Sequence, residues 1–123
     1  MKLEGKAKML RIHFGEDDKW GDKPLYLAIV EKCRELGIAG ATVYRCLEGY
    51  GASAFIRRSH FYSSDAPIMI SVIDSEGNIL KLIPVLDEMV TEGLIAMSNV
   101  EVIKYVSESH PGDKGGPSSA FMF

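Results

Sequence analysis

The sequence contains no long apolar segment of the kind that enters a membrane. No apolar run approaches the roughly 20 residues that a transmembrane helix requires. The N-terminal residues MKLEGKAK also lack the apolar core of a secretory signal peptide. We therefore expect a cytoplasmic protein with no direct membrane insertion.

Cysteine and histidine are scarce, and their spacing shows no metal-binding pattern. The 123 residues include two cysteines, Cys33 and Cys46, and three histidines, His13, His60 and His110. The cysteines form no CxxC motif, and the histidines form neither HxH nor HxxxH. We predict no metal site, and we interpret both cysteines as reduced residues that pack in a helix and a strand.

The motifs of common hydrolases and of nucleotide-hydrolysing enzymes are also missing. The sequence has no GxSxG, no GxxxxGK[ST] phosphate loop and no HExxH. The residues after the first predicted strand, 14–18, are acidic and would repel a phosphate group. We predict no catalytic residue and no enzymatic activity. The net charge of −3 gives no overall reason to expect a nucleic acid partner.

The chain begins with a predicted strand that has one apolar and one mixed face. Residues 8–14 alternate in polarity with the period of a β-strand. The apolar face carries Leu10, Ile12 and Phe14, and the mixed face carries Met9, Arg11 and His13. We expect the apolar face to pack on the core. We interpret His13 as a residue that hydrogen-bonds between subunits, in preference to a metal ligand or a catalyst.

Two later segments have the apolar periodicity of amphipathic helices. In the first, Pro24 lies in the opening turn, Asp22 is expected to cap the N-terminus, and Gly37 is expected to follow the last helical residue. The second covers 75–90 and contains Pro84, which we expect to kink this helix or divide it in two.

Three more strands are predicted, one from residue 41, one at 68–73 and one at 94–106. The order is therefore βαββαβ, which with right-handed crossovers gives an α+β, ferredoxin-like sandwich. Its four-stranded antiparallel sheet would carry both helices on one face. The other face is too apolar to stay wet, so we expect a homo-oligomer. We expect residues 1–106 to form this single domain and the Gly-, Ser- and Pro-rich residues 107–123 to be a disordered tail.

The segment 41–67 contains the candidate binding residues. Gly49, Tyr50 and Gly51 follow the second strand, and two glycines around an aromatic residue let the backbone turn and approach a ligand closely. A tight bend with no ligand is the alternative interpretation. Arg45 shares a strand face with apolar residues, so we expect it to be partly buried and paired with a carboxylate.

A basic and partly aromatic cluster follows in the same segment. Arg57, Arg58 and His60 carry its charge, and Phe55 and Phe61 flank them. Arginine side chains suit phosphate and carboxylate groups, so the cluster is a candidate contact for a small anionic ligand or a partner protein. The alternative is a solvated loop tip with no partner.

Three strings of the sequence resemble the PII-like signalling proteins. They are GATVYRCLEGYG, RRSHFYSSDAP and IPVLDEMVTEGLIAMSNVEVIKY, and the resemblance covers residues 8–105. More narrowly, they resemble the small PII-like family catalogued as domain-of-unknown-function family 190. The resemblance implies a homotrimer with clefts between subunits that bind an adenine nucleotide such as ATP, ADP or AMP. It also implies a regulatory loop, here residues 49–67, that contacts a transporter or an enzyme.

The resemblance also implies roles for individual residues. By position, it implies ligand contacts for Gly49, Tyr50, Gly51, Arg57, Arg58 and Lys104. It implies partner contacts for Phe55, Arg57, Arg58, His60 and Phe61. The connection Glu92-Gly93-Leu94 differs from true PII proteins, because it lacks their glycine- and threonine-rich phosphate-binding loop. The alternative function is a structural or divalent-metal-associated trimer of the same fold that binds no nucleotide.

Overall fold

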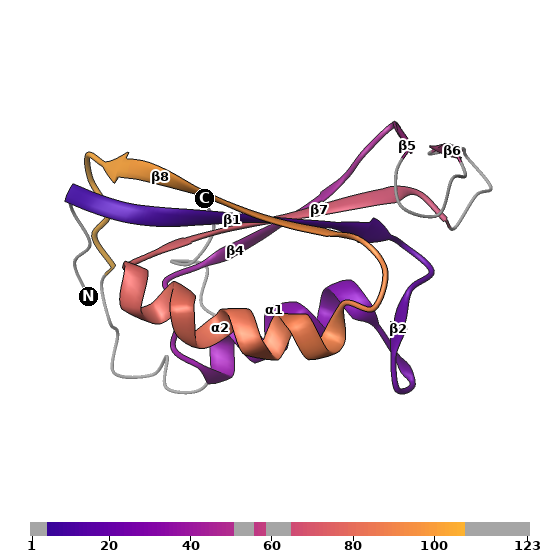
Figure 1. Cartoon of the computed structure of the whole chain (residues 1–123), viewed down its shortest axis with the longest axis horizontal. Helices are drawn as coiled ribbons and strands as arrows, with labels where there is room; N and C mark the ends of the chain where they lie inside the picture. The colour runs from indigo at the N-terminus through magenta and orange to yellow at the C-terminus, as the bar shows by residue number, and fades with distance from the viewer. Residues whose placement is uncertain (1–4, 51–55, 59–64, 108–123) are drawn as a thin grey trace.

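Two amphipathic helices pack against one face of a four-stranded main sheet (Figure 1). This computed structural model describes residues 5–50, 56–58 and 65–107, and for 48–50 and 56–58 it describes the backbone alone. The predicted tail therefore lies almost entirely outside the described residues, and the predicted boundary at residue 106 stays a prediction.

The main sheet has four strands in the order β4-β7-β1-β8, and all neighbours are antiparallel. These strands are β1 (Gly5–Gly15), β4 (Ala41–Arg45), β7 (Pro67–Asp74) and β8 (Leu94–Val102). The two helices are α1 (Leu25–Glu35) and α2 (Glu76–Met89). Together these six elements have the βαββαβ order and the antiparallel sheet of the ferredoxin-like prediction, which is confirmed.

The core lies between the sheet and the two helices. The predicted alternation of β1 is confirmed, because Leu10 and Ile12 are buried whereas Arg11 and His13 are exposed. The fully buried hydrophobic side chains come from both layers: Leu10, Ile12, Ile29, Ile70, Val72, Ile79, Leu82 and Leu86. Burying a side chain of this size contributes about 1.5–3 kcal/mol, so this layer holds the sheet and helices together.

Helix α1 begins later than the sequence suggested. Asp22 does not cap it. Instead, Asp22 lies in the turn of a small hairpin made by β2 (Lys19–Trp20) and β3 (Lys23–Pro24). Gly21 precedes it with φ +62°, a conformation that suits glycine in a two-residue turn. The predicted end of the helix is confirmed, since Gly37 follows with φ +72°.

Helix α2 is continuous, so the predicted division at Pro84 is wrong. Its N-terminus is capped by Ser75, whose hydroxyl accepts a hydrogen bond from the backbone N–H of Asn78 at 3.3 Å. Pro84 cannot donate to the carbonyl of Leu80, but both residues lie on the exposed side of the helix. Water can hydrogen-bond to that carbonyl, which explains why the helix tolerates the proline.

The last strand is shorter than predicted, because β8 ends at Val102. The chain then leaves the sheet edge, and Tyr105 is buried against the connection between α1 and β4. Its hydroxyl donates a hydrogen bond to the carbonyl of Ala39 at 3.0 Å. Burial raises the pKa of this hydroxyl, so it remains protonated and able to donate. Lys104 therefore lies beyond the strand and not on it.

Replacing Tyr105 with phenylalanine should lower the free energy of unfolding by about 1 kcal/mol, because the Ala39 carbonyl loses a buried donor. Urea denaturation at fixed protein concentration measures this change. Tyr26→Phe is the matched control, because the described residues provide no hydrogen bond to the Tyr26 hydroxyl. Equal effects of the two substitutions would contradict the assigned role of the Tyr105 hydroxyl.

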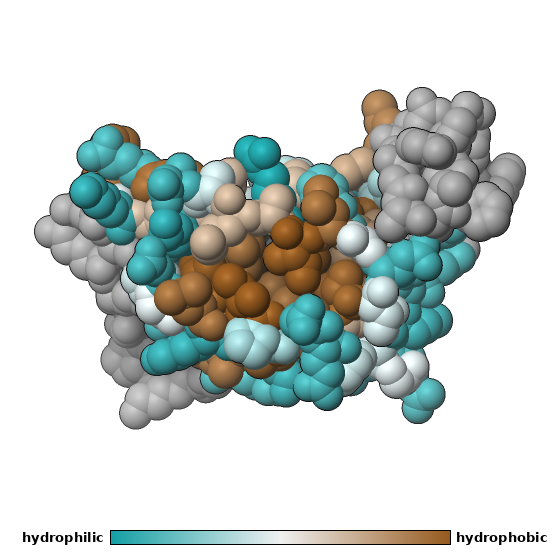
Figure 2. Space-filling model, in the orientation of Figure 1, coloured by the Kyte–Doolittle hydropathy of each residue, from teal (hydrophilic) through white to brown (hydrophobic). Residues whose placement is uncertain are grey.

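The face of the sheet opposite the helices carries a mixture of apolar and polar side chains. By register, Met9 and His13 on β1 share this face with Met69 on β7 and Tyr44 on β4. Tyr44 is exposed. A second apolar surface lies over α2 and the neighbouring sheet edge (Figure 2). Exposed large hydrophobic residues of these two elements are Leu80, Leu94 and Met97.

Candidate functional site

The candidate site lies where the central segment leaves and rejoins the sheet. The chain leaves β4 after Arg45 and returns to β7 at Pro67. The backbone N–H of Cys46 donates to the carbonyl of Pro67 at 2.7 Å, so the outgoing and returning stems lie side by side. Residues 48–50 and 56–58, labelled β5 and β6, lie beyond the end of the main sheet (Figure 1).

Part of the segment between the stems is a two-stranded ribbon, which the sequence did not predict. Strands β5 (Glu48–Tyr50) and β6 (Ile56–Arg58) pair antiparallel, with Gly49 opposite Arg57. We refer to β5 and β6 as the ribbon. Gly49 and Tyr50 are extended strand residues, so the turn predicted at these two positions is wrong. The backbone pairing nevertheless places Gly49 opposite Arg57, whereas Tyr50 pairs with Ile56 and Arg58 pairs with Glu48.

The remaining predicted residues of this segment lie outside the described residues. They are Gly51, Phe55, His60 and Phe61. Their assignments as ligand or partner contacts stay predictions.

Arg45 is paired with a carboxylate, as predicted, and its partner is Glu16. The Nε of Arg45 donates to Oε1 and Oε2 of Glu16 at 3.1 and 3.2 Å. The Arg45 side chain is 41% exposed, because β4 is an edge strand of the main sheet. Sequence reasoning missed Glu16, although its position directly after β1 places it at the sheet end where β4 ends and β7 begins.

Glu16 also contacts the returning stem at Ala66. The backbone N–H of Glu16 donates to the Ala66 carbonyl at 2.8 Å, and the Ala66 N–H donates to Glu16 Oε1 at 3.4 Å. The turn that carries Glu16 is closed by Asp18, whose carboxylate accepts from the Gly15 N–H at 3.1 Å. Glu16 thus holds the two stems at the β1–β2 corner, and Asp18 stabilises the turn that carries it.

Lys104 is far from the ribbon within one chain. The β1–β8 register pairs Gly5 with Val102 at one end of the sheet and His13 with Leu94 at the other. Lys104 follows Val102, whereas the ribbon leaves the end where His13 lies. At about 3.3 Å per residue these two ends are roughly 25–30 Å apart. The structure therefore does not bring Lys104 and Gly49 together in a single subunit.

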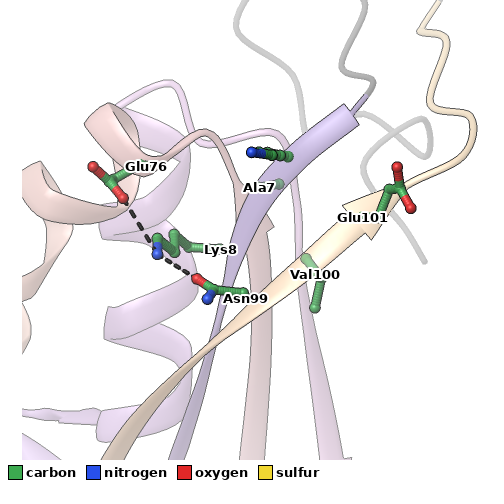
Figure 3. Close-up of a pocket in the computed structure, with 7 residues that line it drawn as sticks. Ala7, Lys8, Glu76, Asn99, Val100 and Glu101 are labelled. Atoms are coloured by element: carbon green, nitrogen blue, oxygen red, sulfur yellow. Dashed lines mark hydrogen bonds and ion pairs between the residues drawn. The ribbon is translucent and has the colours of Figure 1, made fainter.

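A groove of about 570 Å³ lies at the Lys104 end of the sheet (Figure 3). Its lining residues come from β1, β8 and the start of α2: Lys6, Ala7, Lys8, Glu76, Asn99, Val100 and Glu101. The Nζ of Lys8 lies 3.3 Å from Glu76 Oε2 and also donates to Asn99 Oδ1. The groove carries both positive and negative side chains, and Lys8, one of its two lysines, is already paired with Glu76.

The described residues do not form a metal-binding cluster, and the buried thiol of Cys33 is not a reactive one. Within 5–50, 56–58 and 65–107, no group of three or more His, Cys, Asp or Glu side chains is placed to hold a metal ion. Cys33 and Cys46 are both free thiols. Burial raises the pKa of Cys33 to about 12, so this thiol is protonated at neutral pH and packs as an apolar residue. None of the described helices is long and apolar enough to cross a membrane.

Comparison with known proteins places the chain in a family. Residues 7–102 match the family described as DUF190, Uncharacterized ACR, COG1993. The chain belongs to the DUF190 family. The match includes nearly the whole main sheet and the ribbon but ends at the last residue of β8, so Lys104 lies outside it. A DUF190 relative, the UPF0166 protein of Aquifex aeolicus, is 37% identical over 102 residues, covering 80% of this chain and 94% of the relative.

Solved structures show that the DUF190 fold of this chain is similar to PII-like folds. CPII, a nitrogen regulatory PII-like protein from Thiomonas intermedia K12 bound to ADP, AMP and bicarbonate, has a TM-score of 0.57 at 22% identity. The similarity covers 79% of this chain and 88% of CPII. A PII-like signalling protein from Thermus thermophilus has a TM-score of 0.59 at 21% identity, covering 80% and 91% of the two chains. At these identities the likeness concerns the fold.

Proposed function

We propose that this DUF190 protein is a non-enzymatic, PII-like regulator that binds an adenine nucleotide between the subunits of a homotrimer. The nucleotide contacts are the backbone of Gly49, Tyr50 and Gly51 together with Arg57, Arg58 and Lys104. Binding shifts the population of conformations of the segment 49–67 toward one that contacts a partner, such as a transporter or an enzyme. No cofactor is required beyond this effector.

The observation that carries the proposal is the shared fold with CPII, which was solved with ADP, AMP and bicarbonate. That protein shows that a sheet and helices of this arrangement can accompany adenine nucleotide binding. The ribbon of this chain supports the same function, because its backbone pairing places Gly49 directly opposite Arg57, and Arg58 follows in the same strand. Arginine guanidinium groups suit phosphate oxygens, and backbone N–H groups supply further donors.

The distance between Lys104 and the ribbon supports a site between subunits. The two lie at opposite ends of the main sheet of one chain, so a ligand that contacts both must take them from different copies. The mixed open face of the sheet and the apolar surface over α2 and β8 provide surfaces that association of copies would bury. These features favour the oligomer on which the proposed site depends.

The test is calorimetric titration with ATP, ADP, AMP and cyclic nucleotides on protein whose oligomeric state is measured by light scattering. We expect about one nucleotide per subunit for at least one of these compounds. Gly51→Leu should abolish binding and leave the trimer intact, and Arg58→Ala should weaken binding about ten-fold or more, as loss of a charge-assisted contact does.

Lys81→Ala is the matched control for the loss of a positive charge, because Lys81 is exposed on α2. It should leave nucleotide affinity unchanged. If the wild-type trimer binds none of the nucleotides, the proposed effector is wrong. If Gly51→Leu binds as tightly as the wild type, the effector stands but the site does not.

A further inference from the structure

Glu16 connects three parts of the chain that meet at the base of the ribbon. It lies directly after β1, and its carboxylate contacts Arg45, the last residue of β4. The same carboxylate accepts a hydrogen bond from the N–H of Ala66, the residue before β7. The outgoing and returning stems of the ribbon are therefore both held by one side chain from a third element.

The chemistry of these contacts requires a carboxylate at position 16. Arg45 donates through Nε to both carboxylate oxygens, and Oε1 accepts from Ala66 as well. An ionised carboxylate has enough acceptor positions for all these donors. The Glu16 side chain is 24% exposed, so its charge-assisted hydrogen bonds are partly shielded from water.

Backbone hydrogen bonds also fix the two stems where they join the main sheet. The N–H of Cys46 donates to the Pro67 carbonyl, and the N–H of Glu16 donates to the Ala66 carbonyl. A swing of the ribbon relative to the main sheet must begin at these stems. Glu16 contacts both stems at this point, through Arg45 on the outgoing side and Ala66 on the returning side.

We propose that Glu16 is a positioning residue whose carboxylate sets the orientation of the β5–β6 ribbon relative to the main sheet. Breaking its bridge to Arg45 releases the outgoing stem from the β1–β2 corner without unfolding the sheet. The ribbon carries Arg57 and Arg58, so an effect of Glu16 on nucleotide binding rests on the proposed function. The structural part of the inference stands without any ligand.

The test is amide hydrogen exchange, resolved by residue with NMR, on the full-length protein without nucleotide. In Glu16→Gln we expect exchange at the N–H groups of Cys46 and Ala66 to become about three- to ten-fold faster, as loss of a partly exposed charged contact predicts. Exchange at Ile12 and Ile70, in the paired strands β1 and β7, should not change. The melting temperature should also stay close to that of the wild type.

Two further variants separate the bridge from a general effect. Arg45→Gln should accelerate exchange at Cys46 and Ala66, and the effect of the double variant should be smaller than the sum of the two single effects, because both substitutions remove the Glu16–Arg45 bridge. Glu31→Gln breaks the exposed Lys23–Glu31 ion pair at 2.8 Å, away from the ribbon, and should leave both amides unchanged. This variant controls for the loss of a surface carboxylate.

Each outcome decides the inference. Unchanged exchange in Glu16→Gln, additive effects in the double variant, or equal acceleration at Ile12 and Ile70 overturns the positioning role. A protein that binds no nucleotide but shows the coupled exchange retains the positioning role and loses the proposed function. In a protein that does bind, Glu16→Gln should change nucleotide affinity, whereas Glu31→Gln should not.

Discussion

Replacing Gly93 with alanine should lower the free energy of unfolding by about 3 kcal/mol, because the added carbon has no room. A Cβ at this position would lie 2.2 Å from the backbone oxygen of His13 and 3.2 Å from a side-chain carbon of Val90. Gly93 also has φ +156°, which L side chains rarely adopt. The backbone of β1 cannot yield easily, since His13 pairs with strands on both sides.

Gly77→Ala is the matched control for this substitution. Gly77 lies in the first turn of α2, and a Cβ there would meet no heavy atom within 4 Å. Alanine favours the helix by up to about 1 kcal/mol over glycine, so this variant should be neutral or slightly more stable. Urea denaturation of both variants at one protein concentration gives the comparison. A loss below about 1 kcal/mol in Gly93→Ala would contradict the close approach of the α2–β8 connection to the backbone of β1.

The sequence alone predicts the strands and helices whose apolar periodicity can be recognised within a short run of residues. The alternation of β1 and the apolar spacing of both helices appear within short windows, because each element buries one face on the core. Gly93 lies in the connection between α2 and β8. Its actual constraint, the backbone of His13, is 80 residues away and has no local signal.

Other elements were missed because tertiary contacts or short turns determine them. The β2–β3 hairpin has a readable signal, a Gly-Asp pair between two short strands, that was assigned instead to a helix cap. The end of β8 is set by the burial of Tyr105 against Ala39, a contact across 66 positions. Glu16 contacts residues that lie 29 and 50 positions away in the sequence. The local sequence therefore predicts that Arg45 pairs with a carboxylate but does not indicate which one.

The resemblance to PII-like proteins predicted the family and the fold more directly than it predicted the site. The family match confirms the identification, and the strand order confirms the sheet. The candidate residues that the structure describes divide into two groups: those of the ribbon, which is held by backbone pairing, and Lys104, which lies at the other end of the sheet. The proposed site takes its residues from two chains, and this is why the nucleotide titration must be made on protein of known oligomeric state.

Asp74 should be the most sensitive buried polar position in the fold. Only 1% of this residue is exposed, and its two carboxylate oxygens accept hydrogen bonds from separate backbone N–H groups. Oδ2 accepts from Ala39 at 2.8 Å, and Oδ1 accepts from Ser75 at 2.6 Å. One side chain at the end of β7 therefore accepts hydrogen bonds from two backbone N–H groups, one in the connection into β4 and one at the start of α2.

Asp74→Ala should lower the free energy of unfolding by about 3 kcal/mol, because two buried N–H groups lose their acceptor and a cavity forms. Asp74→Asn keeps the volume and one oxygen but turns an NH₂ group toward a donor, so it should cost about 2 kcal/mol. Asp87→Ala, at an exposed position on α2, should stay within about 0.5 kcal/mol of the wild type. The N–H of Ala39 donates to Asp74, and the carbonyl of Ala39 accepts from Tyr105, so the effects of Asp74→Ala and Tyr105→Phe should not be additive. Strict additivity would mean that the two contacts stabilise separate parts of the molecule and that Ala39 does not join them.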